Sequence, residues 1–354
     1  MLNSENVLLA LNDIQDDYIE SARTMLGYKV GERNRTMVKK RIVAFALAAT
    51  LVLSLGIAAY AAYVRWSRGI EQKLPATDAE RQLAEESGLS DTSQTVSSNV
   101  NGVTISVEQT VIDNGTANIA LRIEGWPLDE AQARSAMLWN RRLTFDGETA
   151  PASGGSFVEE CGANNRTSVI AADGSMEYDI WANTGDKLDT LAGKEICITI
   201  ESLGLTSGKG GQYQALVEGP WELKWTPNSN SEVLAVNVSV PIGDTGLQLL
   251  SAEIGSVSAK VSLKLDKPWD GYQTLEFYDW QLAGVRLKDG TVLTNIFSAP
   301  TQEGYADIDN LVFEMHYSSN RILLPSQIDA LVFAANSPWA RTLDDGELVI
   351  IPIA

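Results

Sequence analysis

The chain has 354 residues, of which 44 % are hydrophobic and 21 % charged, with 46 acidic and 27 basic side chains. This length leaves room for more than one domain with its own core. Beyond residue 64 the chain carries 40 of the acidic but only 20 of the basic side chains. So acidic a region argues against binding of nucleic acid or anionic lipid, because both need clustered Lys and Arg.

The first 41 residues predict a small helical tail. Ser4 can cap a first helix, and Asp17 with Glu20 has the spacing of a capping box for a second. The second helix presents one largely apolar face, made of Ile14, Tyr18, Ile19, Ala22 and Met25. Two such short helices bury little surface against each other, so this face needs a partner: the bilayer, a second copy or a cytoplasmic protein. Alternatively, the tail is loosely ordered and only orients membrane insertion.

Residues 42–64 contain no charged residue and no proline. At about 1.5 Å per residue, a helix of this length crosses a hydrocarbon core of about 30 Å. Tyr60, Tyr63 and Trp66 lie at its far end, where aromatic rings favour the membrane interface. The segment therefore predicts a single transmembrane helix.

Orientation follows from the basic residues beside this span. Seven Lys and Arg residues precede it, whereas Arg65, Arg68, Lys73 and Arg81 follow over a similar distance. We therefore expect a cytoplasmic N-terminus and an extracytoplasmic C-terminal region in the cell membrane. A cleaved signal peptide is the main alternative, but its apolar region is shorter and lies nearer the start of the chain.

Residues 65–98 predict a stalk helix and a linker. Thr77 and Glu80 have capping-box spacing, and Gly88 is a stop signal. Ser90 to Ser98 is rich in Ser and Thr, which favours an irregular connection.

Residues 99–228 change to the period of two that is typical of strands. Two alternating apolar runs flank Asp113-Asn114-Gly115, which predicts a β-hairpin with one buried face. Further short strands follow, with Gly, Asp and Asn turns between them and no long helix. This pattern favours an antiparallel sandwich.

Residues 233–354 repeat this pattern after a polar stretch at 227–231. Trp139 and the Asp146-Gly147 turn are echoed by Trp280 and Asp289-Gly290, and other features recur in the same order. The shared order predicts a diverged duplication, with two sandwiches of about 120 residues each.

Two cysteines, Cys161 and Cys197, lie beyond the span. In an oxidising compartment they could form a disulfide, which would stabilise the fold by roughly 3 to 4 kcal/mol. The alternative is two free thiols. No CxxC and no cluster of His accompanies them, so we expect no metal site.

The sequence offers no catalytic constellation. The one histidine, His316, lies in a strand-like run, and no nucleophile, phosphate-binding or zinc-protease motif is present. Asp-Gly pairs are best explained as hairpin turns rather than calcium loops. The tryptophans beyond Trp66 suit a sandwich core, as the repeated positions of Trp139 and Trp280 suggest; exposed, they could stack on sugars. We predict a protein that is not an enzyme and needs no cofactor.

The run 11–22, the span that ends in Ala-Tyr-Ala-Ala-Tyr at 59–63, and Asn101-Gly102-Val103-Thr104-Ile105-Ser106-Val107 together resemble DUF4179-domain membrane proteins of Gram-positive bacteria. The resemblance covers the tail, the span and the first sandwich to about residue 225. Such proteins are similar in layout to membrane anti-sigma factors, whose cytoplasmic segment holds a sigma factor while an outer domain senses the envelope. The tail lacks the zinc motif of the best-known anti-sigma domains.

We therefore expect a mainly β protein with a helical cytoplasmic tail (1–41), one transmembrane helix (42–64), a stalk and linker (65–98) and two immunoglobulin-like antiparallel sandwiches (99–228 and 233–354). The resemblance implies anti-sigma-factor-like signalling, in which the Tyr18 face binds a sigma factor. The alternative is a surface-anchored binding or adhesion protein without a cytoplasmic partner.

Overall fold

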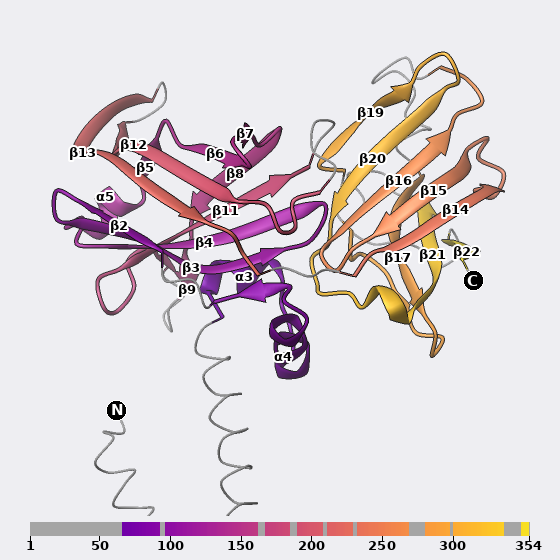
Figure 1. Cartoon of the computed structure of the whole chain (residues 1–354), viewed down its shortest axis with the longest axis horizontal. Helices are drawn as coiled ribbons and strands as arrows, with labels where there is room; N and C mark the ends of the chain where they lie inside the picture. The colour runs from indigo at the N-terminus through magenta and orange to yellow at the C-terminus, as the bar shows by residue number, and fades with distance from the viewer. Residues whose placement is uncertain are drawn as a thin grey trace, which may run out of the picture. The chain divides into compact units, whose positions relative to one another are not determined.

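The structure is a computed structural model, which describes residues 66–92, 96–161, 167–184, 190–207, 211–228, 232–268, 280–297, 300–335 and 348–353. It is mainly β, with several antiparallel sheets and few helices (Figure 1). The expected cytoplasmic tail and the expected span at 42–64 lie outside these residues.

Two larger sheets form a first pair. Sheet 1 has the order β1-β3-β4-β11-β8, with β2 beside β3. Its strands are β1 (Ser90–Asp91), β2 (Ser97–Val100), β3 (Val103–Ile112), β4 (Thr116–Glu124), β8 (Ala152–Phe157) and β11 (Met176–Asn183). Sheet 2 has the order β13-β12-β6-β7, with β5 beside β12. Its strands are β5 (Ala136–Trp139), β6 (Arg142–Phe145), β7 (Glu148–Thr149), β12 (Ile196–Ser207) and β13 (Gln212–Trp225). A small separate sheet joins β9 (Glu160–Cys161) to β10 (Thr167–Ser168).

A second pair follows. Sheet 3 has the order β14-β15-β16-β20-β19. Its strands are β14 (Leu234–Pro241), β15 (Gln248–Ile254), β16 (Ser258–Lys264), β19 (Gln302–Asp307) and β20 (Val312–Ser318). Sheet 4 has the order β18-β17-β21-β22. Its strands are β17 (Trp280–Leu287), β18 (Val292–Leu293), β21 (Ile328–Ala335) and β22 (Leu348–Pro352).

The two pairs share one strand order, as the predicted duplication requires. The hairpin β3-β4 corresponds to β15-β16, and β11-β8 corresponds to β20-β19. In the other sheets, β6, β12 and β13 correspond to β17, β21 and β22. The repeated sequence features imply the matches of the opening hairpins and of β6, β12 and β13, whereas the match of β11-β8 with β20-β19 comes from the structure.

Alternation places one face of each sheet in a core. On β4, Ile119, Leu121 and Ile123 are fully buried and pack with Phe145, Ile198 and Trp221 from sheet 2. A second cluster fills the space between sheets 3 and 4, with Val261 and Phe313 from one and Leu331 and Phe333 from the other. Each pair is therefore a sandwich with its own apolar centre.

Local turn residues in the sequence predicted the two hairpin turns described next. Asp113-Asn114-Gly115 joins β3 to β4, and Asp146 and Gly147 both adopt positive φ, 49° and 83°, in the tight turn between β6 and β7. Residues 212–225 form one long continuous strand, β13. A single short helix, α5 (Glu130–Ala133), precedes β5.

The largest difference concerns residues 65–98, expected to be a stalk and linker. The described part forms α3 (Arg68–Lys73), α4 (Asp78–Glu86) and the strands β1 and β2, both of which pair with β3. Apolar side chains from both helices are buried against the sandwiches. A short 3-10 turn, η3 (Pro325–Gln327), precedes β21.

Candidate functional site

Residues 66–92, here called the docking segment, lie beside sheet 1 (Figure 1). Its two helices begin at capped residues: the Ser67 hydroxyl accepts a hydrogen bond from the Ile70 N–H, and Thr77 forms the predicted capping box with Glu80. These caps satisfy N–H groups that a helix start leaves without partners. The helices are therefore fixed locally before they meet the sheet.

Trp66, Ile70 and Leu74 recur every four residues and are buried, with exposed fractions of 5, 0 and 1 %. Their cluster includes Val111 and Ala120, which point away from the sandwich core. Burial of an aliphatic side chain such as Ile70 or Leu74 contributes about 2 kcal/mol. These side chains therefore cover the outer face of sheet 1 and form an apolar cluster separate from the sandwich core.

A buried carboxylate holds the start of α3. Glu177 on β11 is 3 % exposed, and its Oε1 accepts a hydrogen bond of 2.6 Å from the Gly69 N–H. Its Oε2 accepts from the Arg68 N–H at 3.2 Å and from Arg68 Nε at 3.4 Å. A carboxylate at a helix N-terminus is favoured because it satisfies free N–H groups and faces the positive end of the helix dipole.

The end of α3 is bound by a second acid on the same strand. Lys73 forms an ion pair with Asp179, whose side chain is almost fully buried. Burial raises the pKa of the Asp179 carboxyl, and the ammonium group of Lys73 partly opposes this rise. Two outward positions of β11 thus clamp both ends of one short helix.

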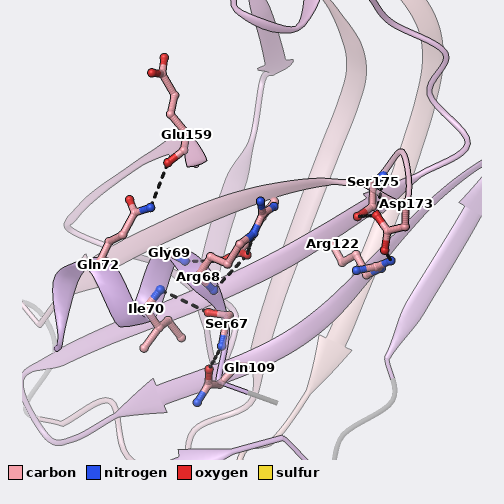
Figure 2. Close-up of polar contacts among 11 residues, drawn as sticks. Ser67, Arg68, Gly69, Ile70, Gln72, Gln109, Arg122, Glu159, Asp173 and Ser175 are labelled. Carbon is pink, nitrogen blue, oxygen red and sulfur yellow. Dashed lines mark hydrogen bonds and ion pairs between the residues drawn. The ribbon is translucent and has the colours of Figure 1, made fainter. Parts of the chain in front are cut away.

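Polar side chains extend the contact on either side (Figure 2). The Ser67 N–H donates a 2.7 Å hydrogen bond to Gln109 Oε1, and Gln109 in turn donates to the Ser90 hydroxyl at 2.8 Å. At the other side, Gln72 Nε2 donates to the carbonyl oxygen of Glu159 at 3.0 Å. Gln109 is fully buried, so its two hydrogen bonds are shielded from water, whereas the Gln72 hydrogen bond is exposed.

Arg81 joins α4 to α3. Its guanidinium lies 5.7 Å from the centre of the Trp66 ring and 2.5 Å from Glu71 Oε1. Its Nε also donates to the Ala76 carbonyl at 3.1 Å. Arg81 is only 6 % exposed, so its stacking on Trp66 is largely shielded from water, whereas the ion pair is partly solvated because the Glu71 side chain is 46 % exposed.

Gly69 lets the helix approach the sheet. A Cβ at this position would lie 2.7 Å from Val158 Cγ2, 2.9 Å from Glu177 Oε1 and 3.0 Å from Asp179 Cβ. Any side chain at residue 69 would therefore push α3 off β11.

Away from the docking segment, Arg122 on β4 binds the turn at Asp173, with 2.6 Å between Nη2 and Oδ2 (Figure 2). The Ser175 hydroxyl also donates to Asp173 at 2.6 Å. Hydrogen bonds from Ser175, and then from Arg122, hold the pKa of the Asp173 carboxyl well below its usual range. This turn is stabilised by charge but is well exposed.

The docking segment also reaches the second sandwich. Val257 and Ile322 belong to the same buried cluster as Trp66 and Ile70. Arg321 lies 3.8 Å from Glu80 on α4. Contacts from both sandwiches therefore converge on residues that directly follow the predicted span.

A buried carboxylate joins the two sandwiches. Asp113, which is fully buried in the turn between β3 and β4, accepts hydrogen bonds of 2.9 Å from the Val257 N–H and the Ser258 hydroxyl. It also accepts from the N–H groups of Gly115 and Thr116 in its own turn, each at 2.9 Å. Burial raises the pKa of the Asp113 carboxyl, and the hydrogen bonds partly oppose this rise.

The structure brings few of the sequence-predicted site residues together. The tail face Ile14, Tyr18, Ile19, Ala22 and Met25 lies outside the described residues. Cys197 on β12 is a free cysteine here, so no disulfide is seen at it. Cys161 lies on β9 in a different sheet, and its side chain is outside the described set, so the pairing stays a prediction.

The tryptophans, expected to fill the sandwich cores, divide into buried and exposed side chains. Trp126, Trp221 and Trp225 are buried as predicted, but Trp139 is 45 % exposed and stacks on Tyr213, so its assignment to the core is wrong.

Over the described residues, no group of His, Cys, Asp and Glu is arranged to hold a metal ion. In the same ranges, no helix is long and apolar enough to cross a membrane.

Sequence reasoning missed the docking segment. The four-residue spacing of Trp66, Ile70 and Leu74 was a usable signal, but the prediction used Trp66 as a membrane-interface residue and left Ile70 and Leu74 in a polar stalk. A second signal was the small, uncharged Ala120 on the face of β4 expected to meet solvent.

Comparisons with known proteins add little. No protein-family model and no curated protein matches the sequence. Among solved structures, the chain is similar to "the conserved domain protein from Bacillus anthracis", with 13 % identity and a TM-score of 0.47. That likeness covers 76 % of this chain and 93 % of the other. It is too distant to support a function.

Proposed function

We propose that this protein is a single-pass membrane signalling protein of the DUF4179 type, with an anti-sigma-factor-like layout. A cytoplasmic tail binds a regulator, one helix crosses the cell membrane, and two immunoglobulin-like sandwiches sense the envelope. The support from the structure is the docking segment, which follows the expected span directly and contacts both sandwiches.

An anchored protein and a signalling protein need different connections between the membrane and the outer domains. A protein that is merely anchored needs only a flexible spacer between membrane and binding domain. Here Glu177 and Asp179 hold α3, and Ile70 is fully buried. A change in how the sandwiches meet would therefore alter the contacts of the segment that leads to the membrane helix.

The test uses the full-length protein, isolated from its source bacterium after mild cross-linking. An extracytoplasmic-function sigma factor is expected to co-purify with the native chain and to be lost with the double variant Tyr18→Asp/Ile19→Asp. The matched control is Thr24→Asp, compared with Tyr18→Asp alone, because each variant adds one charge and Thr24 lies off the predicted face. Equal recovery from these two single variants would overturn the assignment.

A second test links the outer region to the tail. Gly69→Ala is expected to displace α3 and to change the amount of regulator bound, although residue 69 lies on the other side of the expected span. If regulator binding stays the same while α3 is displaced, the docking segment does not relay a signal.

A surface-anchored binding or adhesion protein is the second candidate, and one observation favours it. Trp139 is exposed and stacks on Tyr213 at 4.5 Å, with an interplanar angle of 14°. Exposed aromatic faces can stack on sugar rings. This function requires that replacing the tail leaves binding of the native chain to cell-wall glycan unchanged, whereas Trp139→Ala abolishes it.

A further inference from the structure

The outermost strand of sheet 1, β8, has one side without a hydrogen-bonding partner. Its other side pairs with β11 over six consecutive residue pairs, from Phe157 with Tyr178 to Ala152 with Asn183, and no register shift interrupts them. No backbone hydrogen bond joins the free side to any residue that the structure describes. β8 is therefore an open sheet edge, where the backbone of an added strand can form hydrogen bonds.

The other long sheet edges are protected, whereas β8 is not. Register shifts interrupt β13, β14 and β19, and a proline lies within each of β13, β14 and β22. Both features hinder pairing with a further strand. β8 has no register shift, no proline and no charged side chain. Its sequence therefore leaves this edge open to strand addition.

Two glycines at the centre of β8 lie beneath aromatic rings. A Cβ on Gly154 would lie 2.6 Å from the indole ring of Trp181, and a Cβ on Gly155 would lie 2.6 Å from Tyr178 Cε1. Trp181 is on the outward face of sheet 1 and partly exposed, whereas Tyr178 belongs to the sandwich core. Each face of the edge thus offers a ring against which alternate side chains of an added strand can pack.

Arg141 lies on the Tyr178 side of this edge. It precedes β6 and, by alternation, shares the face of Leu143 and Phe145, which are buried in the core. Arg141 interacts electrostatically with Tyr178 on β11. It is partly exposed, so a ligand can approach it from solvent. Arg141 therefore lies at the open side of the sandwich, between sheet 2 and the edge of sheet 1.

Arg141 forms no ion pair within the part of the chain that the structure describes, and its Nη1 has no hydrogen-bond partner there. By contrast, Arg68 and Arg122 beside sheet 1 pair with Glu177 and Asp173. Burial lowers the pKa of the Arg141 guanidinium, because the charged form loses hydration. A carboxylate would offset this cost through a charge-assisted hydrogen bond. The edge therefore favours a strand with an acidic side chain on its core-facing side.

We propose that β8 binds an extended peptide segment of another protein as an added strand, with an acidic side chain of that segment paired to Arg141. Apolar side chains on the other face of the segment pack against Trp181. β8 leads into Glu159, whose carbonyl oxygen accepts a hydrogen bond from Gln72 of the docking segment, so the edge and that segment are directly connected. The role of this peptide as a signal rests on the signalling function proposed above, but its binding does not.

The experiment measures binding of labelled synthetic peptides to the full-length protein in detergent by fluorescence anisotropy. Physiological salt is used, because it screens the overall negative charge of the chain. The Glu peptide is Ser-Thr-Ile-Glu-Ile-Thr-Ser with blocked ends, in which Glu and Ile point to opposite faces of a strand. The Gln peptide replaces Glu by Gln, and the Pro peptide replaces both Ile residues by Pro, which removes two backbone donors.

We expect the Glu peptide to bind saturably, the Gln peptide to bind about tenfold or more weakly, and the Pro peptide not to bind. Hydrogen exchange measured by mass spectrometry locates the added strand. The Glu peptide should slow exchange of amides in β8, because those on its free side are otherwise open to water.

Variants locate the charge. In Arg141→Gln, the Glu and Gln peptides should bind equally, because the difference between them comes from this one side chain. The matched control is Arg142→Gln, which removes the neighbouring arginine, exposed on the opposite face of β6. This control should keep the full preference for the Glu peptide, and both variants should keep the melting temperature of the native chain to within a few degrees.

Three results would overturn the proposal: no saturable binding of the Glu peptide at millimolar concentration, equal loss of preference in Arg142→Gln, or protection by the peptide outside β8 only. Pairing of β8 with a second copy, seen as a dimer that the Glu peptide does not dissociate, would also overturn it. If the Glu peptide binds at β8 but regulator recovery from the tail does not change, only the signalling function fails.

Discussion

Sheets 1 and 3 share one order of five strands, to which sheet 1 adds β2, but use their outer faces differently. On sheet 1, the outward side chains of β11 include Glu177 and Asp179, which are buried beneath α3. On sheet 3, the outward side chains of β20 include Glu314, which is partly exposed and lines a cleft between the sandwiches. The corresponding face of each sandwich thus holds a chain segment in one case and is partly exposed in the other.

The difference shows how much surrounding structure changes the role of an acidic side chain. Glu177 accepts hydrogen bonds from two backbone N–H groups at the start of α3. Because these donors belong to the backbone of the helix, they hold fixed positions beside the carboxylate. Glu314 pairs with the flexible Lys260 across two strands. The first acid therefore contributes mainly to stability, whereas the second forms a partly solvated ion pair that contributes little.

The largest expected effect comes from removing the cover of sheet 1. Trp66→Ala should lower the free energy of unfolding by about 4 kcal/mol, because it empties a buried site and removes the partner of Arg81. Trp139→Ala is the control and should cost much less, because that ring is largely exposed. Chemical denaturation of both variants checks this, and equal losses would mean that the docking segment is not packed as described.

The paired acids provide a direct comparison. Glu177→Gln should destabilise the chain by about 2 kcal/mol, because a neutral amide replaces one of the two oxygens that accept from α3. Glu314→Gln should change stability by less than about 0.5 kcal/mol, as is usual for an exposed ion pair. Thermal unfolding of the two variants under one buffer condition distinguishes the roles, and a reversal of the order would refute them.

Two glycines test the same contrast through sterics. Gly69→Ala should cost about 1.5 kcal/mol and speed hydrogen exchange in α3, since the new methyl group meets Val158 and Glu177. Gly304→Ala places its methyl group in open space and should be close to neutral. Hydrogen exchange measured by mass spectrometry reports both effects, and unchanged protection of α3 in Gly69→Ala would contradict the close approach.

The smallest effect is a pH dependence at the junction of the sandwiches. Because burial raises the pKa of Asp113 in the folded state, the native chain gains stability relative to Asp113→Asn as pH falls through the folded pKa toward the unfolded value. This contribution is fully present below the unfolded pKa and is lost as pH rises. Denaturation midpoints of both proteins between neutral and mildly acidic pH check the sign. If the midpoint of the native chain falls relative to that of Asp113→Asn on acidification, the prediction is contradicted.

Short-range features were predictable because local chemistry decides them. The Asp113-Asn114-Gly115 turn between alternating runs predicted β3 and β4, and the capping box at Thr77 predicted α4. The repeat also predicted several of the strand matches between the two sandwiches. These signals operate within a few residues or compare one segment with another.

The candidate site depends on contacts between distant segments. Gly69 meets Glu177 across more than 100 residues, and Arg321 reaches α4 from the second sandwich. Alternation shows that Glu177 and Glu314 point outward, but not which of the two has a cover. The polar composition of residues 65–98 concealed a buried stripe, because Trp66, Ile70 and Leu74 stand among many polar neighbours directly after the expected span.

The meeting of the two hairpin turns at Asp113 has a mechanical consequence. A side chain at Gly115 would collide with Ser258, and one at Gly255 would collide with Asp113, so the turns abut with no room to slide. Arg321 and Ile322 of the second sandwich contact the docking segment close to this junction in the chain's packing. We therefore expect that a change in how the two turns pack would alter the contacts that α4 makes with the second sandwich.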